Sequence, residues 1–312
     1  MKLTHGQAVL TMVAVTLMWS VAGVVTRHLQ YAHSFEVTFW RSFFTTVSLL
    51  IILPVWPGCG VFRAMRWASP AFWISGVCWS VMFTAYMVAL TLTSVGNVLV
   101  TMSVSPLLTA LLARVVIGHP IAPRTWGAIV FAGLGMGYMF GSQVHVAFGP
   151  GSTLLGLAVA ACVPMASAVN WTVVQRSQAQ GEKIDLVPSV LVGAVLSSLL
   201  TLPLAVPFVA TSADLRLLAF LGLFQLAIPC ILAVIGANAL KAPEVALLAL
   251  LEVIFGILWA WLGANEVPAR EVLMGGTLVI GALAGNELLG WRGRARAAGV
   301  PGTGPACTSS AE

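Results

Sequence analysis

The stretch VALLALLEVIFGILWAWLG, residues 245–263, decides the fold class of this chain. It is long enough to cross a bilayer as a helix, because a spanning helix needs about 20 consecutive apolar residues. One charged residue, Glu252, lies near its middle. A carboxylate at that depth needs a reason, since its insertion costs about 2.5–3.5 kcal/mol and a leucine would suit lipid better.

The rest of the chain has the same character. It has 312 residues, of which 59% are hydrophobic and only 8% are charged, whereas a soluble domain carries about 25% charged residues. Because lipid-facing backbone must satisfy its own hydrogen bonds, we predict an all-α integral membrane protein with ten transmembrane helices. The ten apolar runs are 7–27, 36–56, 70–92, 95–117, 124–141, 152–174, 186–209, 215–237, 243–263 and 270–290.

The basic residues predict the orientation of the chain. If the N-terminus is cytoplasmic, the opposite side and its flanks hold only Arg27, Arg41, Arg216 and Arg270, and most other Lys and Arg lie inside. The positive-inside rule therefore predicts a multi-pass chain with both termini in the cytoplasm. The net charge of +5 is explained by this topology and by anionic lipid, so we expect no nucleic-acid partner.

The two halves of the chain match each other in order. An offset of 149 positions brings Arg27 onto Arg176 and Glu36 onto Asp185. An offset of 148 superposes two GxxxG pairs, at 133–137 and 281–285, and an offset of 147 aligns the ends of 100–119 and 247–266. Ordered matches with so little drift predict an internal duplication.

The duplication predicts two five-helix repeats, 1–145 and 146–290, followed by a tail, 291–312, that we expect to be disordered. Because five is odd, the second repeat enters the membrane from the opposite face. Such 5+5 inverted repeats are typical of alternating-access transporters, whose substrate site lies near the midplane. The GxxxG pairs are expected to let runs five and ten pack closely.

Several short motifs also resemble a known family. They are LMWS (17–20), FWR (39–41), SPLLTALLARVVIG (105–118) and LLEVIFGILWAWLG followed by NE (250–266). In this order and spacing they are similar to EamA-type members of the drug/metabolite transporter superfamily. The resemblance implies a ten-helix inner-membrane carrier, often an exporter of amino acids, other metabolites or toxic compounds. The chain departs from the family pattern at His119, where an acid is common, and at Val253, where a proline is common.

Glu252 and Arg41 are the main candidates for a transport site. For Glu252 three roles stay open: a substrate contact, a proton-exchange group, or a structural acid. Removal from water favours the neutral form of a carboxyl group, which suits proton exchange. Arg41 begins a polar stripe on its helix and could bind a substrate carboxylate with its forked guanidinium. It could also pair with Glu252, or extend to the outer headgroups.

Other polar and aromatic residues recur on faces that we expect to point inward. The predicted substrate-binding or coupling set is completed by Trp19, Tyr86, Asn97, Ser105, Asn170, Gln225 and Trp259. Prolines inside membrane helices remove a backbone hydrogen bond, so we predict hinges at Pro106, Pro164 and Pro229. Each polar residue alone is more often a helix–helix contact than a ligand contact.

The function predicted is secondary active transport of small organic molecules by alternating access, with protons as a possible second partner. No Walker loop, HExxH or GxSxG motif occurs, and the five cysteines form no CxxC pair. We therefore expect no enzyme activity, no cofactor, no metal and no disulfide. A passive channel or a receptor is the first alternative, and an intramembrane enzyme the second. The sequence does not give the substrate, the direction of transport or the oligomeric state.

Overall fold

The protein is helical throughout the residues that the structure describes. The computed structural model describes residues 4–31, 34–55, 69–118, 123–144, 153–179, 186–237 and 242–298, and contains no strand in these ranges. The first half contains α1 (His5–Thr26), α2 (Ser34–Leu53), α4 (Pro70–Leu92), α5 (Val95–Met102), α6 (Ser105–Ile117) and α7 (Pro123–Val144). The second contains α8 (Thr153–Ala179), α9 (Leu186–Ala205), α10 (Ser212–Phe220), the π-helix η2 (Leu221–Ala227), α11 (Ile228–Ala237), α12 (Ala242–Ala264) and α13 (Arg270–Ala298).

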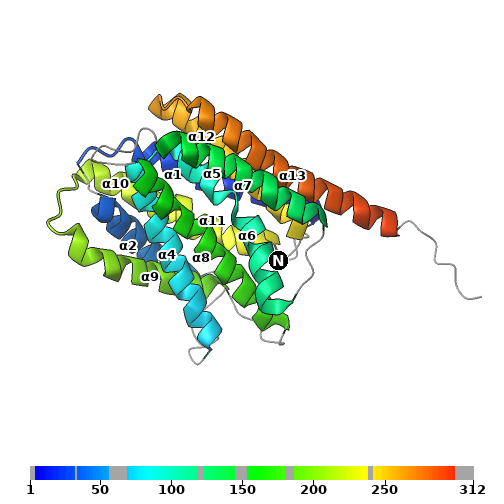
Figure 1. The fold of residues 1–312 in the computed structure, drawn as a ribbon. Helices are drawn as coiled ribbons and strands as arrows, with labels where there is room; N and C mark the ends of the chain where they lie inside the picture. The colour runs from blue at the N-terminus through cyan, green and yellow to red at the C-terminus, as the bar shows by residue number, and fades with distance from the viewer. Residues whose placement is uncertain are drawn as a thin grey trace, which may run out of the picture.

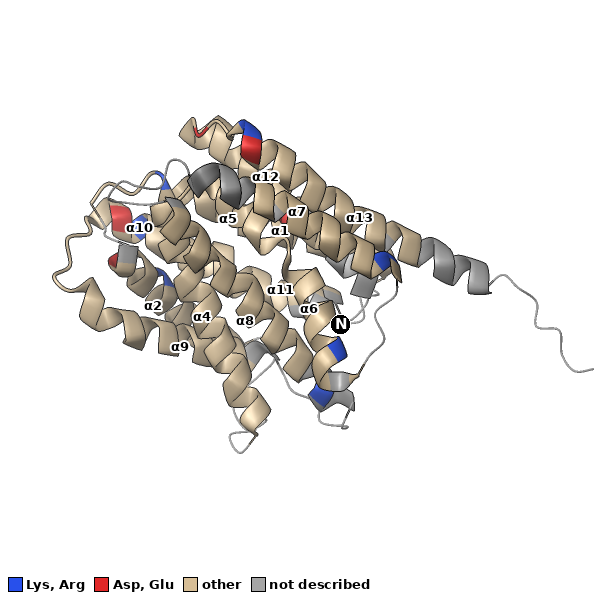
Figure 2. Ribbon diagram, viewed as in Figure 1, with Lys and Arg blue, Asp and Glu red and all other residues tan. Residues whose placement is uncertain are grey.

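All ten predicted runs coincide with helices, and the all-α membrane fold class is confirmed. Within the described residues, eight helical segments are long and apolar enough to cross a membrane, and 251–264 forms a shorter apolar helix. The helix α7 covers the fifth run but is not among the eight, so the count of ten spans is not confirmed. Large exposed side chains such as Leu200 and Leu262 cover the outside, as lipid-facing surface requires. Figure 2 shows most charged residues near the ends of the helices.

Helices of the two halves pack against each other in equivalent pairs. In Figure 1 the helix α13 runs beside α7, and α2 lies beside α9. The helix α4 packs against α8 and α9, while its counterpart, the α10–η2–α11 segment, packs against α1 and α2. Similarly, α12 packs on α1, and its counterpart α5–α6 packs on α8. If each helix is replaced by its counterpart in the other half, these helix pairs are still in contact, as a two-fold relation between the halves predicts. The repeat boundaries themselves stay a prediction.

One local expectation is wrong. A Cβ added at Gly133, Gly137, Gly281 or Gly285 would meet no atom within 4 Å, so the GxxxG pairs do not mediate close packing. The close contact between α7 and α13 uses Gly135 instead, whose added Cβ would lie 2.8 Å from the carbonyl oxygen of Gly275.

The predicted tail, 291–312, begins within a helix. The helix α13 continues to Ala298, because Arg and Ala are strong helix formers and dominate the segment WRGRARAA. The remainder of the predicted tail, 299–312, lies outside the described residues.

Candidate functional site

Arg41 lies inside the helix bundle. Its side chain is only 1% exposed. Its Nε and Nη2 atoms donate hydrogen bonds of 3.1 and 2.7 Å to Oε1 of Gln225, on η2. Nη1 is buried and has no hydrogen-bond partner. Arg41 therefore does not extend to the headgroups, and one of its donor atoms is left free in the interior.

Gln225 reaches Arg41 from a π-helix, and Pro229 explains the irregular backbone. A proline has no N–H, so Pro229 cannot bond the carbonyl of Gln225 four residues earlier. The next N–H toward the N-terminus, that of Ile228, bonds to Leu223 five residues before it. Single-turn π segments within membrane or soluble helices are frequent at functional sites. The side-chain Nε2 of Gln225 also donates to the carbonyl of Trp19, at 3.3 Å, which links α1 to this segment.

Gly222 allows η2 to touch α2 next to Arg41. A Cβ at Gly222 would lie 2.8 Å from the backbone N of Thr45 and 3.0 Å from the carbonyl oxygen of Arg41. The hydroxyl of Thr45 donates both to Arg41 O, at 2.8 Å, and to Gly222 O, at 3.2 Å. The position of Arg41 relative to Gln225 therefore depends on this close backbone contact.

Gly222→Ala should destabilise the protein, because its Cβ would meet the Cβ of Phe44 at 2.7 Å and two backbone atoms of α2, none of which lies at the end of a flexible side chain. Overpacking of this kind costs about 1–3 kcal/mol. The matched control is Gly133→Ala, where the added Cβ meets nothing within 4 Å. Thermal unfolding of both purified variants in the same detergent measures the difference. A midpoint for Gly222→Ala at or above that of the control would contradict the expectation.

Aromatic rings form one wall beside Arg41. The guanidinium carbon lies 5.8 Å from the ring centroids of both Phe83 and Tyr86, which come from α4. Such contacts hold a cation in a desolvated setting. The hydroxyl of Tyr86 is buried without a hydrogen-bond partner. Two polar groups, Nη1 of Arg41 and the hydroxyl of Tyr86, are thus unsatisfied near each other, which buried polar groups seldom are.

Glu252 belongs to the same region. It lies near the middle of α12, is half-buried, and interacts electrostatically with Tyr86 and Cys230. Arg41 acts on the same two groups, and the side chain of Trp19 forms a hydrogen bond with Cys230. Four predicted residues, Trp19, Arg41, Tyr86 and Gln225, are thus linked to one another, and Glu252 shares two neighbours, Tyr86 and Cys230, with Arg41. Within the described residues, Arg41 and Glu252 form no direct ion pair.

Four other predicted residues are placed elsewhere. The side-chain Nδ2 of Asn97 donates to the hydroxyl of Thr93, four residues earlier, and its Oδ1 is buried without a partner. Ser105 donates to Ser167, at 2.7 Å, and Asn170 accepts from Ser75, at 2.6 Å. These contacts tie neighbouring helices together.

Trp259, the fourth, lies apart from the interior residues. It is 37% exposed. The face of α12 that packs inward runs through Val253, Gly256 and Ala260, which are buried, and this turns Trp259 toward the outside. The indole is therefore placed at the surface of the bundle.

The three predicted hinges differ in structure. The fourth run is interrupted between α5 and α6, directly before Pro106, where α6 begins at Ser105. Pro229 directly follows η2 and the first residue of α11. Pro164 lies within α8, which is assigned as helical on both sides of it. A break in the helix therefore accompanies Pro106 and an irregular turn accompanies Pro229.

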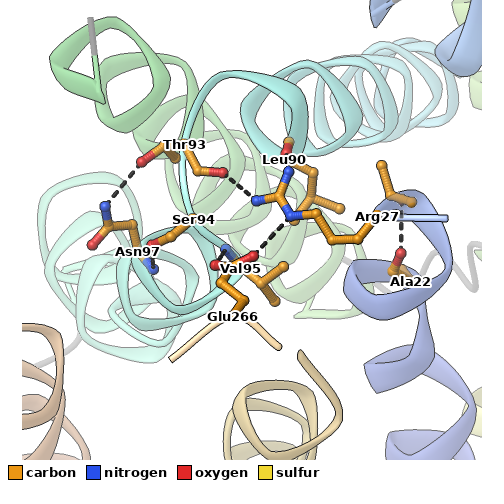
Figure 3. A network of polar contacts seen from close by, with 9 residues as sticks. Ala22, Arg27, Leu90, Thr93, Ser94, Val95, Asn97 and Glu266 are labelled. Atoms are coloured by element: carbon orange, nitrogen blue, oxygen red, sulfur yellow. Dashed lines mark hydrogen bonds and ion pairs between the residues drawn. The ribbon is translucent and has the colours of Figure 1, made fainter. Parts of the chain in front are cut away.

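Sequence reasoning missed a polar network at one end of the bundle (Figure 3). Arg27 donates from Nε to Glu266, from Nη1 to the carbonyl of Leu90 and from Nη2 to that of Thr93, each at 2.7 Å. Glu266 also accepts from the backbone N–H of Val95, at 2.7 Å. The internal repeat marks Arg27, but no local pattern indicates a partner 239 residues away.

A surface hollow between α7 and α13 is separate from this region. It is lined by apolar residues that include Phe131, Met274 and Leu278, and none of the predicted site residues contributes to it. In the described ranges, no group of three or more His, Cys, Asp or Glu side chains could hold a metal ion.

Comparison with known proteins gives a related family and a similar fold. Residues 6–141 match the model of the EamA-like transporter family. A solved crystal structure, titled only as that of a protein, is similar at 18% identity with a TM-score of 0.60, over 92% of this chain and 99% of that one. At this identity the likeness shows the fold alone. No curated protein matches the chain.

Proposed function

We propose that this chain, whose residues 6–141 match the model of the EamA-like transporter family, is a secondary active transporter of small organic molecules. The observation that carries the proposal is Arg41, buried in the interior with Nη1 free. A guanidinium in a membrane bundle is costly, and such residues mark substrate or ion pathways. It is a multi-pass membrane protein, since eight helical segments among the described residues are long and apolar enough to cross a bilayer.

The residues around Arg41 favour a substrate with a carboxylate. Gln225 occupies Nε and Nη2, so Nη1 is the donor that remains for a ligand. The free hydroxyl of Tyr86 adds a second polar group on the same side. Glu252 would contact a cationic group of the substrate or exchange a proton with the solvent. A zwitterion such as an amino acid would satisfy both charges.

The finer parts of the proposal concern direction and energy. We propose export across the inner membrane, with both termini cytoplasmic and with proton exchange at Glu252. The halves 1–145 and 146–290 would rock against each other around the region of Arg41. The equivalent packing of helix pairs from the two halves supports this, and so do the break before Pro106 and the π-helix before Pro229.

Reconstitution of the purified protein in liposomes tests the proposal. Radiolabelled amino acids, tried individually, should show saturable uptake and counterflow, in which unlabelled substrate inside drives entry of label. Flux that rises without saturation would favour a passive channel. No flux of any compound, including organic cations and anions, would favour a receptor or an enzyme and would contradict the proposal.

A further inference from the structure

The charged network at one end of the bundle takes no part in the proposed site. We call this end the Arg27 face: α1, α4, α9 and α12 end there, and α2, α5, α10 and α13 begin there. The guanidinium of Arg27 bonds to Glu266 after α12, and to the carbonyls of Leu90 and Thr93 at the end of α4. Cations are stabilised at such helix C-termini. Arg27 therefore ties α1 and α4 to the segment after α12.

Both carboxylate oxygens of Glu266 accept a hydrogen bond, one of them at the start of a helix. Oε1 accepts from the N–H of Val95, the first residue of α5, while Oε2 accepts from Arg27 (Figure 3). A carboxylate at a helix N-terminus satisfies an N–H that has no partner within the helix. The ion pair is also partly shielded from water, since the two side chains are 28% and 21% exposed. One acid of the second half thus holds two helix ends of the first.

Two further carboxylates on the Arg27 face join the halves. Glu36, fully buried at the start of α2, accepts from the backbone N–H groups of Val209 and Ala210 at 2.8–3.1 Å. Asp214, in α10, accepts from the N–H groups of Gln30 and Tyr31 at 3.0 and 3.4 Å. Each contact links a residue of 1–145 to one of 146–290. Like Glu266, these two acids therefore oppose separation of the halves.

The structure also identifies the position equivalent to Glu266 in the first half. The helices α5 and α12 begin at Val95 and Ala242. Their runs end with a left-handed residue, Gly118 at φ 78° and Asn265 at φ 52°. Both pairs differ by 147 positions, so the residue after each, His119 and Glu266, is equivalent. His119 lies outside the described residues, but its identity means that the opposite face has no acid at this position.

We infer that Arg27, Glu266, Glu36 and Asp214 form a latch that closes the Arg27 face, and that the chain carries the Arg27–Glu266 part of it on this face only. The inference rests on the proposed function, because a transporter must open each face in turn. Opening toward the Arg27 face breaks these contacts, whereas opening toward the other face does not. The resting protein is therefore closed at the Arg27 face.

A cysteine already present in the interior reports the opening. Cys230 is buried and lies in the field of Arg41 and Glu252. In a parent variant that keeps only Cys230, with Cys59, Cys78, Cys162 and Cys307 replaced by alanine, a membrane-impermeant maleimide is added from either side of the membrane. Glu266→Ala and Arg27→Ala should speed labelling from the Arg27 face by roughly tenfold, within the 5- to 150-fold range of typical couplings. Labelling needs no transported substrate, so it is independent of the test of transport.

Matched variants make the result decisive. Arg216→Ala removes an exposed charge from the same face and should leave the rate unchanged. Glu266→Gln keeps an acceptor for Val95 but loses the ion pair, so its increase should be smaller, and it replaces the alanine variants if they fail to fold. The latch would be overturned if the rate of labelling of Cys230 did not change, or if it rose equally from both sides of the membrane. It would also be overturned if Arg216→Ala raised the rate as much as the latch variants do.

Discussion

Replacement of Glu252 by glutamine is expected to abolish transport driven by a pH gradient while counterflow of the same substrate persists. Glutamine keeps the size and the hydrogen-bonding capacity of the side chain but cannot bind and release a proton. Without a proton-exchanging group a pH difference cannot drive the substrate, so gradient-driven accumulation should fall to the level measured without a pH difference. The measurement is accumulation of the substrate that shows counterflow in wild-type liposomes, with and without an imposed pH difference.

Expression and insertion of the Glu252→Gln protein should be intact or improved, since a charge at the helix centre costs about 2.5–3.5 kcal/mol to insert. Glu271→Gln is the matched control, because it makes the same change in the first turn of α13, away from the Arg41 region. Wild-type accumulation by Glu252→Gln would rule out the coupling role. Loss of both accumulation and counterflow would instead identify Glu252 as a substrate contact.

The helices could be predicted because lipid imposes a simple rule on the sequence. Each spanning segment must be continuously apolar, so the ten runs could be marked from composition alone, and the structure places helices over all of them. The break before Pro106 and the π-helix at Pro229 could be anticipated only as irregularities, because a proline shows which hydrogen bond is lost but not how the backbone adjusts. The GxxxG motif failed because close packing depends on which helix face points to the neighbour, and here Gly135 does.

The site could be predicted in part for a related reason. A polar side chain within an apolar run is costly, so Arg41, Gln225 and Glu252 stand out in the amino-acid sequence itself. Their partners do not, because Arg41 and Gln225 are 184 residues apart. Trp259 is 37% exposed, and its spacing from Glu252 could not show this, because burial depends on the neighbours of α12. The charged contacts of the Arg27 face lie at helix ends and in the segments between helices. In such segments the sequence has no helical periodicity from which a contact could be predicted.

The second large effect is expected at Arg41. Arg41→Ala should weaken carboxylate-bearing substrates, both anionic and zwitterionic, more than cationic ones. A hydrogen bond to a charged group contributes about 1.5–3 kcal/mol, which corresponds to a roughly 10- to 150-fold loss of apparent affinity. Competition against counterflow of a fixed labelled substrate, with pairs of compounds that differ only in the carboxylate, measures this difference. Equal losses for all charge classes would show that Arg41 is a structural anchor instead.

Two substitutions of Gln225 distinguish the effect of the positive charge of Arg41 from the effect of the position of its side chain. In Gln225→Glu the two bonds from Arg41 would reach a carboxylate in place of an amide oxygen. The pair would then be neutral as a whole, so substrate carboxylates should be rejected although Arg41 is still present. Gln225→Leu removes the acceptor and leaves a buried cation without its partner, so thermal stability should fall, whereas Gln225→Glu should raise it. If Gln225→Glu bound carboxylates as tightly as wild type, the free Nη1 of Arg41 could not be the group that attracts them.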